Sequence, residues 1–383
     1  MTAYLLRRFG QMLLTLFMII SLAFFLVQAQ PGDYTSTYAQ NPDLPPNVRA
    51  QIQASFGLDK SLGEQYLLHI KNSFTGNFGV SFGHYPRTVM DVIKERLPRT
   101  AVLFLTATVI SFYLGFVLGK AMAWRRGGFM EYTATISGAT LFTVFTPWFA
   151  LMMIWTFAFK LGWFPLGKFL DPLVWREAPV AANSVFNDML LTAGAFTVFI
   201  FLAILISKKA GGRRWRTWLL PAAAAGAVVI PVAWGLSGTA YLALDILKHM
   251  VLPIATLTLI SFAGTMLLTR NSMLEILRED FVMAARAKGL PESVVRDKHA
   301  ARNALLPVVT SLVYSLAFAI DGGIITETIF SWPGMGLTLL QAVRSEDLPL
   351  AMGAFVFIGI FALGAHLVAD VLYAFLDPRI RYQ

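Results

Sequence analysis

The residue types that usually carry out chemistry are few in this sequence and stand apart from one another. Cysteine is absent, which excludes disulfides, thiolate metal sites and cysteine nucleophiles. No H-E-x-x-H, G-x-S-x-G or G-x-x-x-x-G-K-[ST] pattern occurs, so we expect no zinc-protease site, no hydrolase nucleophile and no phosphate-binding loop. We therefore expect no catalytic residue, no metal and no cofactor in this chain, and a protein that is not an enzyme. The five histidines are single and lack metal-ligand spacing: His69, His84, His249, His299 and His366.

Three residues in the last quarter of the chain are candidates for contact with a transported solute. Asp321 lies in an apolar run and is followed by Gly322 and Gly323. A carboxylate inside a membrane is costly in lipid and should face protein or water. Glu327 and Trp332 lie just beyond that run. Each of the three also fits a structural role, such as a hydrogen bond within a helix bundle.

The composition is that of a membrane protein. Of the 383 residues, 56% are hydrophobic and only 14% are charged, against about 25% charged in soluble proteins. The net charge of +9 could indicate a nucleic-acid partner, but no basic run is interleaved with aromatic residues. We expect no nucleic acid, because Lys and Arg also accumulate in the cytoplasmic loops of membrane proteins.

Eight apolar runs are long enough to cross a bilayer as helices. The first exceeds the usual length of a signal peptide's apolar core and has no good cleavage site after it, so we expect it to be retained. The predicted spans are Phe9–Val27, Ala101–Gly119, Ile136–Phe159, Leu190–Ile206, Trp218–Leu236, Met250–Thr269, Leu305–Thr326 and Ala351–Phe375.

The distribution of basic residues predicts the orientation. With both termini in the cytoplasm, the cytoplasmic segments hold 19 of the 31 Lys and Arg residues. An excess of Lys and Arg marks the cytoplasmic side, so eight spans with both ends inside fit best. The cytoplasmic segments are then 1–8, 120–128, 207–216, 270–304 and 376–383.

This topology divides the chain into three parts. Residues 1–27 form the N-terminal span, 28–99 an external cap region, and 100–383 the transmembrane domain. Within the cap, Pro46–Phe56 and Pro86–Arg96 have the character of short helices that begin near a proline.

The cytoplasmic loop 270–304 carries the main functional signal. Asp280–Lys288 is rich in helix-forming residues, and Gly289 suits the left-handed position that ends a helix. Pro291 and Glu292 suit the first turn of a second helix. The loop could be an ordinary basic connection, but two short amphipathic helices exposed to the cytoplasm are better explained as a docking surface.

This loop resembles the EAA loop of ATP-binding-cassette (ABC) importer permeases, in the form found in dipeptide, oligopeptide and nickel permeases. Met283 stands where the wider family has Glu. The coupling-loop residues that the resemblance indicates are Met283, Ala284, Ala285, Gly289, Leu290, Pro291 and Glu292. Further similar stretches are Tyr4–Arg8, Pro31–Asp33, Phe56–Lys60, Glu64–Tyr66, Arg96–Thr100, Arg302–Leu305, Glu327–Gly336 and Leu376–Arg381.

The resemblance implies an all-α integral membrane protein with about eight transmembrane helices, namely a six-helix type I importer core plus an extra hairpin at 190–236. It implies a bacterial cytoplasmic-membrane permease subunit that moves peptides or similar small solutes. The implied partners are a second, homologous permease, two cytoplasmic ATPase subunits that bind ATP and Mg, an extracytoplasmic binding protein, and membrane lipids. The alternative is an ATPase-independent secondary transporter or channel.

Overall fold

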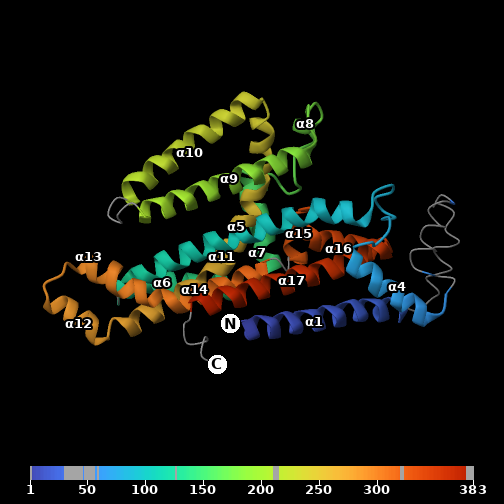
Figure 1. Cartoon of the computed structure of the whole chain (residues 1–383). Coiled ribbons are helices and arrows are strands. Elements are labelled where there is room, and N and C mark those ends of the chain that lie inside the picture. The colour runs from blue at the N-terminus through green and yellow to red at the C-terminus, as the bar shows by residue number, and fades with distance from the viewer. Residues whose placement is uncertain are drawn as a thin grey trace. The chain divides into compact units, whose positions relative to one another are not determined.

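The computed structural model describes residues 2–29, 46, 57, 60–125, 127–209, 215–319 and 323–376. Apart from residue 46, the predicted helix Pro46–Phe56 lies outside these residues, and so does Asp321. Over the described ranges the chain is helical, with no named strand (Figure 1).

The helices are α1 (Thr2–Gln28), α4 (Leu62–Thr75), α5 (Val89–Trp124), α6 (Phe129–Thr143), α7 (Thr146–Met153), the π-helix η1 (Ile154–Lys160), α8 (Pro172–Trp175), α9 (Ala182–Lys209), α10 (Trp215–Ser237), α11 (Ala240–Ile276), α12 (Asp280–Ala287), α13 (Glu292–Val294), the π-helix η2 (Val295–Ala300), α14 (Ala301–Ala319), α15 (Ile324–Ile329), α16 (Met335–Arg344) and α17 (Leu348–Leu376). By contacts, the chain forms one compact unit of residues 1–156 and 253–383, and a second of residues 157–252.

Five described helices are long and apolar enough to cross a membrane, or six if the bent pair α6 and α7 counts as one span. These confirm an all-α membrane protein. The spans predicted at Trp218–Leu236 and Leu305–Thr326 include residues whose backbone or side chains lie outside the described part, so the total of eight stays a prediction.

The span predicted as Ile136–Phe159 is not one straight helix. α6 and the helix that begins with α7 meet at an angle of 108°. Val144 and Phe145 between them are extended, and Pro147 occupies the first turn of α7. Proline has no N–H to continue the hydrogen-bond ladder, so it breaks the first helix and starts the second.

α5 joins two elements that the sequence predicts separately. Residues 89–96 of the predicted cap helix Pro86–Arg96 and the whole predicted span Ala101–Gly119 belong to one helix of 36 residues, which contains Pro98. It begins with a capping box in which Thr88 accepts a hydrogen bond from the backbone N–H of Asp91, and Asp91 accepts one in return. α5 therefore crosses the predicted boundary between cap and transmembrane domain without a break.

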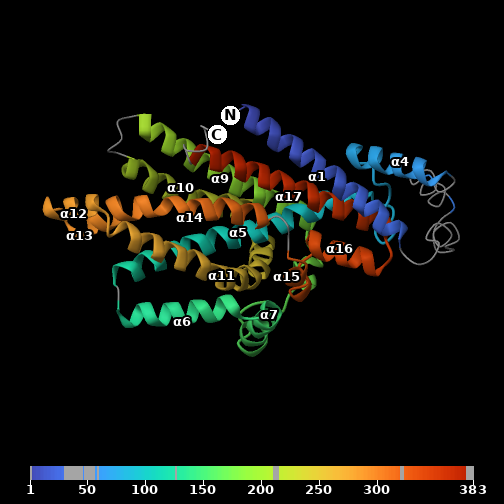
Figure 2. The ribbon, with the colours of Figure 1, turned by 90° about the horizontal axis from the view of Figure 1, so that it is seen from below.

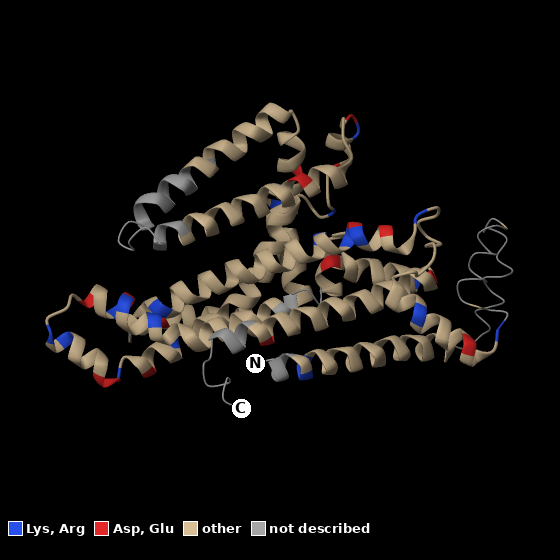
Figure 3. Cartoon of the chain, in the orientation of Figure 1, with Lys and Arg blue, Asp and Glu red and all other residues tan. Residues whose placement is uncertain are grey.

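In the first unit, α17 packs between α1 and α14, and α5 packs against both α14 and α17 (Figure 2). Charged residues gather toward the ends of these helices, while their middle stretches are largely uncharged (Figure 3). This is the charge distribution of helices that cross a hydrocarbon layer. The start of α1 and the end of α17 lie toward the side on which α12 and α13 project (Figure 1).

Glycines allow α5 and α11 to approach closely. A Cβ atom at Gly115 would lie 2.6 Å from the carbonyl oxygen of Phe262, and one at Gly119 would overlap the carbonyl oxygen of Met266. Backbones that come this close leave no room for a side chain at the crossing. The backbones of the two helices are therefore in close contact at this crossing.

The second unit contains the predicted extra hairpin. α9 packs against α10, and each helix extends beyond its predicted span, Leu190–Ile206 or Trp218–Leu236. The nearly buried carboxylate of Asp245 accepts hydrogen bonds from the backbone N–H of Asp171 at 3.0 Å and from Nε1 of Trp175 at 2.8 Å. This carboxylate fixes the segment before the hairpin to the start of α11.

Candidate coupling site

The predicted helix–glycine–proline–helix pattern of the coupling loop (residues 270–304) is present in the structure. α12 ends at Ala287, two residues before Gly289, which has a left-handed backbone with φ of 74°. Leu290 N–H then bonds back to the carbonyl of Ala285 at 3.4 Å, in the manner of a Schellman motif. Pro291 precedes the first residue of α13, which continues through η2 into α14. The second helix of the loop thus runs without a break into α14, which contains Pro307.

The coupling loop has a small hydrophobic core of its own. Val282, Ala285 and Val295 are buried against one another, and Leu290 packs on them. A hydrophobic contact of this kind commonly accompanies the Schellman motif. Ala285 is therefore buried within the loop itself, with only 5% of its surface exposed.

Other side chains of the loop are exposed and partly apolar. Met283 is 55% exposed and Phe281 is 40% exposed, and Ala284, Pro291 and Glu292 are also exposed. Sequence reasoning missed Phe281, although its aromatic side chain two residues before Met283 was a readable signal. Exposed apolar side chains on a projecting helix are a feature of interaction surfaces.

Aromatic and ionic contacts attach the loop to the end of α5. The guanidinium groups of Arg286 and Arg296 lie 5.9 Å and 5.7 Å from the ring centroid of Trp124. Asp297 pairs with Lys120 of α5 at 3.1 Å and with Arg296 at 2.8 Å. The hydrogen bond from Arg296, supported by Lys120, lowers the pKa of Asp297 to about 2. Asp297 is therefore ionised, and its ion pairs intact, at any physiological pH.

Glu327 is not open to a passing solute. Its side chain is fully buried. It accepts hydrogen bonds from the hydroxyl of Thr100 at 2.7 Å and from the backbone N–H of Leu337 at 2.9 Å. The same Thr100 hydroxyl accepts a hydrogen bond from the N–H of Met335 at 2.7 Å. Glu327 thus joins α15, α16 and α5 in one buried polar network.

Trp332 belongs to the same network. Its ring is fully buried, and Nε1 donates to the carbonyl of Arg99 at 3.2 Å. Gly334 lies against the carboxylate of Glu327, so that a Cβ atom there would overlap it. Thr100 and Arg99 were missed as partners of these residues because more than 200 residues separate them along the chain. The geometry gives Glu327 and Trp332 a structural role, while Asp321 lies outside the described residues.

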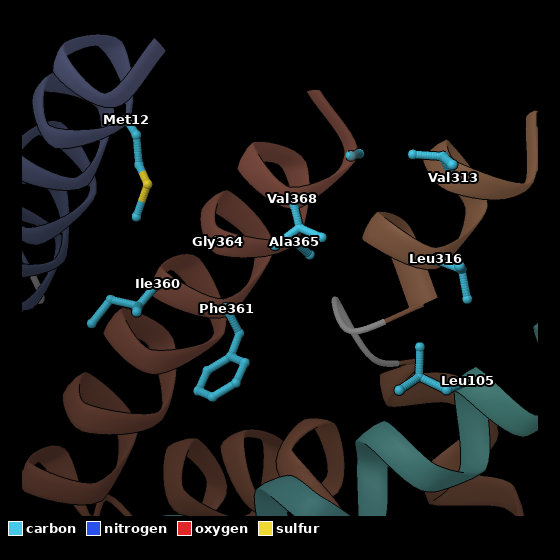
Figure 4. A pocket seen from close by; sticks show the side chains of 10 residues that line it. Met12, Leu105, Val313, Leu316, Ile360, Phe361, Gly364, Ala365 and Val368 are labelled. Atoms are coloured by element: carbon cyan, nitrogen blue, oxygen red, sulfur yellow. The ribbon is translucent and has the colours of Figure 1, made fainter. Parts of the chain in front are cut away.

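A pocket of about 500 Å³ opens between α1, α14 and α17, with Leu105 of α5 at its edge (Figure 4). Its described lining is entirely apolar, including Met12, Val313 and Phe361. Such a pocket offers no hydrogen bond to a polar solute. It is therefore not a candidate for recognition of cargo.

Comparisons with known proteins agree with this architecture. The family model described as "Binding-protein-dependent transport system inner membrane component" matches residues 111–382, and the model for the N-terminal part of such components matches residues 1–106. Together they cover nearly the whole chain.

Individual relatives align over their full length. The chain is 31% identical to the di/tripeptide transport system permease protein DppB of Pseudomonas aeruginosa and 30% identical to the dipeptide transport system permease protein DppB of Escherichia coli. It is 29% identical to the oligopeptide transport system permease protein AppB of Bacillus subtilis. Each alignment covers 100% of both chains. The chain therefore belongs to the family of binding-protein-dependent transport system inner membrane components, and it is a multi-pass permease subunit of an ABC importer.

Proposed function

We propose that this chain forms one half of the pathway through which peptides cross the bacterial inner membrane. The named relatives transport dipeptides, tripeptides or oligopeptides, which supports short peptides as the cargo class. The other half is a homologous second permease, and cargo arrives on an extracytoplasmic binding protein. The family assignment favours this ATP-driven class over a secondary transporter or channel.

The observation that carries the proposal is the coupling loop. It folds around its own core, projects beyond the ends of the neighbouring helices, and exposes Phe281 and Met283. In our proposal this face docks in a groove on a cytoplasmic ATPase subunit, in the helix-in-groove mode. Two ATPase subunits bind ATP and Mg, and their closure favours the outward-open state of the permease pair. The loop and both termini then lie in the cytoplasm.

The docking face can be tested by exchanging one exposed side chain. Met283→Lys places a charge on the proposed apolar contact, so the ATPase subunits should no longer co-purify with the membrane complex. Val343→Lys is the matched control, because Val343 is 58% exposed, against 55% for Met283, and belongs to α16. Equal recovery of ATPase subunits with both variants would reject the docking face.

A further inference from the structure

The end of α5 and the coupling loop are fastened by contacts that the docking proposal does not use. Arg286 comes from α12 and Arg296 from η2, and both guanidinium groups lie within 6 Å of the ring centroid of Trp124. Cations at this distance from an indole are attracted to it. Trp124 therefore holds both helical segments of the loop to α5 at once.

Packing around this contact is tight. Next to Trp124, Ala123 is buried with Met273 of α11 and with Ala300, Ala301 and Ala304 at the junction of η2 and α14. Four of these five side chains are alanines, so the backbones lie close together. The pair of Lys120 and Asp297 lies one turn from Trp124 on α5. Together these contacts leave the loop little freedom to move without α5.

The structure of α5 allows a movement at one end of the helix to be transmitted to the other end. It is a continuous helix from Val89 to Trp124, and Gly115 and Gly119 press it against the backbone of α11. Thr100, near the other end, is bonded to the buried carboxylate of Glu327 and to the N–H of Met335. The helix thus connects the coupling loop to the helix pair α15 and α16 (residues 324–344), which we call the α15–α16 elbow. Close-packed elements of this kind move as units, because interiors are dense and not freely deformable.

We infer that Trp124 is the positioning residue that transmits movement of the coupling loop into α5, and through the Thr100–Glu327 contact into the α15–α16 elbow. This inference rests on the proposed docking of the loop on an ATPase. Docking is assigned to the exposed side chains around Met283, and transmission to the contacts that Arg286 and Arg296 make with Trp124. Removing Trp124 should therefore leave the ATPase bound but disconnect its cycle from the permease.

The test uses the complete complex, with its second permease and ATPase subunits, in lipid vesicles. Three quantities are measured: ATPase subunits retained per permease, ATP hydrolysis with and without binding protein loaded with a tripeptide, and peptide uptake. Trp124→Leu removes the indole face, Trp124→Phe keeps a weaker aromatic face, and Tyr113→Leu is the control. Tyr113 also lies on α5, but is 69% exposed.

In Trp124→Leu we expect the full complement of ATPase subunits, with stimulation of hydrolysis by loaded binding protein reduced roughly fivefold or more and uptake reduced in parallel. Trp124→Phe should be intermediate, and Tyr113→Leu should match the wild type. Normal stimulation in Trp124→Leu would overturn the inference, and so would loss of the ATPase subunits, which would assign Trp124 to docking. Should Trp124→Leu fail to assemble, wild-type stimulation in Trp124→Phe would also overturn it. ATPase recovery reports on docking and stimulation reports on transmission, so failure of either proposal is recognised separately.

Discussion

The carboxylate of Glu327 accepts a hydrogen bond of 2.7 Å from the hydroxyl of Thr100, which lies 227 residues earlier in the chain. Both groups are shielded from solvent: Thr100 and Glu327 each have no exposed surface. The bond joins the short helix α15 to the long helix α5. Of the two roles that the sequence left open for Glu327, contact with a solute or a structural role, this bond supports the structural one.

The hydrogen bond between Thr100 and Glu327 predicts an energetic coupling between these two residues. Thr100→Val leaves a buried acceptor without one donor, which should destabilise the protein by about 1–3 kcal/mol. Combined with Glu327→Gln, the double-mutant cycle should give a coupling energy of about 0.5–3 kcal/mol. Thermal unfolding of the purified complex measures both values. Thr140→Val is the control, since the exposed Thr140 hydroxyl donates a hydrogen bond within its own helix, to the carbonyl of Ile136. Additive effects of the two substitutions would contradict a stabilising contact between Thr100 and Glu327.

Two neighbouring alanines of α12 should respond differently to the same substitution. Ala285 is 5% exposed in the core of the loop, whereas Ala284 is exposed. Ala285→Asp should destabilise the loop by at least about 2 kcal/mol, because it buries a charge without a partner. Limited trypsin cleavage after Arg286 and Lys288 should therefore speed up in Ala285→Asp and stay at the wild-type rate in Ala284→Asp. Equal cleavage rates would show that the two faces of α12 are misassigned.

The effect of a substitution at Gly289 should depend on backbone strain and not on a steric clash. Its φ is 74°, and a Cβ atom there would meet no other atom within 4 Å. A β-branched residue in this conformation costs about 1–2 kcal/mol or more, while Asn tolerates it better. Recovery of ATPase subunits should thus decrease in the order wild type, Gly289→Asn, Gly289→Val. A Gly289→Val complex with full ATPase content and normal transport would argue against a requirement for the turn.

The orientation can be read with single cysteines, since the chain has none of its own. Ser207→Cys and Ser293→Cys should be protected from a membrane-impermeant thiol reagent added to intact cells, because the positive-charge pattern places both in the cytoplasm. Ser61→Cys, at the start of α4, should react. Labelling of Ser207→Cys from outside would overturn the eight-span topology.

The hairpin of α9 and α10 should matter for assembly and not for choice of cargo. The hairpin lies wholly within the second unit, residues 157–252. The hydrogen bonds of Asp245 to Asp171 and Trp175 join parts of this unit outside the hairpin. Replacing 182–237 by a short Gly/Ser linker should lower the amount of complex in the membrane, while the ratio of uptake rates for two different peptides stays the same. A changed ratio would instead indicate that the hairpin contributes to the pathway.

Local sequence determined the features that depend on neighbouring residues. Apolar runs predicted the five long apolar helices that the structure describes, because a helix in lipid must satisfy its backbone internally. The order of Gly289 and Pro291 predicted the turn in the coupling loop, since each residue restricts or permits a specific backbone conformation. The joint presence of several short motifs gave the family resemblance, which the full-length matches confirm.

Tertiary structure decided what depends on residues far apart. Ala284 and Ala285 are the same residue type, and only the folded loop turns one outward and the other into a core with Val282 and Val295. The sequence allowed Glu327 to be either a pathway residue or a structural residue. The folded chain brings Thr100, 227 residues earlier, within hydrogen-bond distance of its carboxylate. Trp124 carried no signal of its own, because its two arginines come from separate helices of the loop. Side-chain partners of this kind are set by the packing of whole helices, which short-range periodicity does not encode.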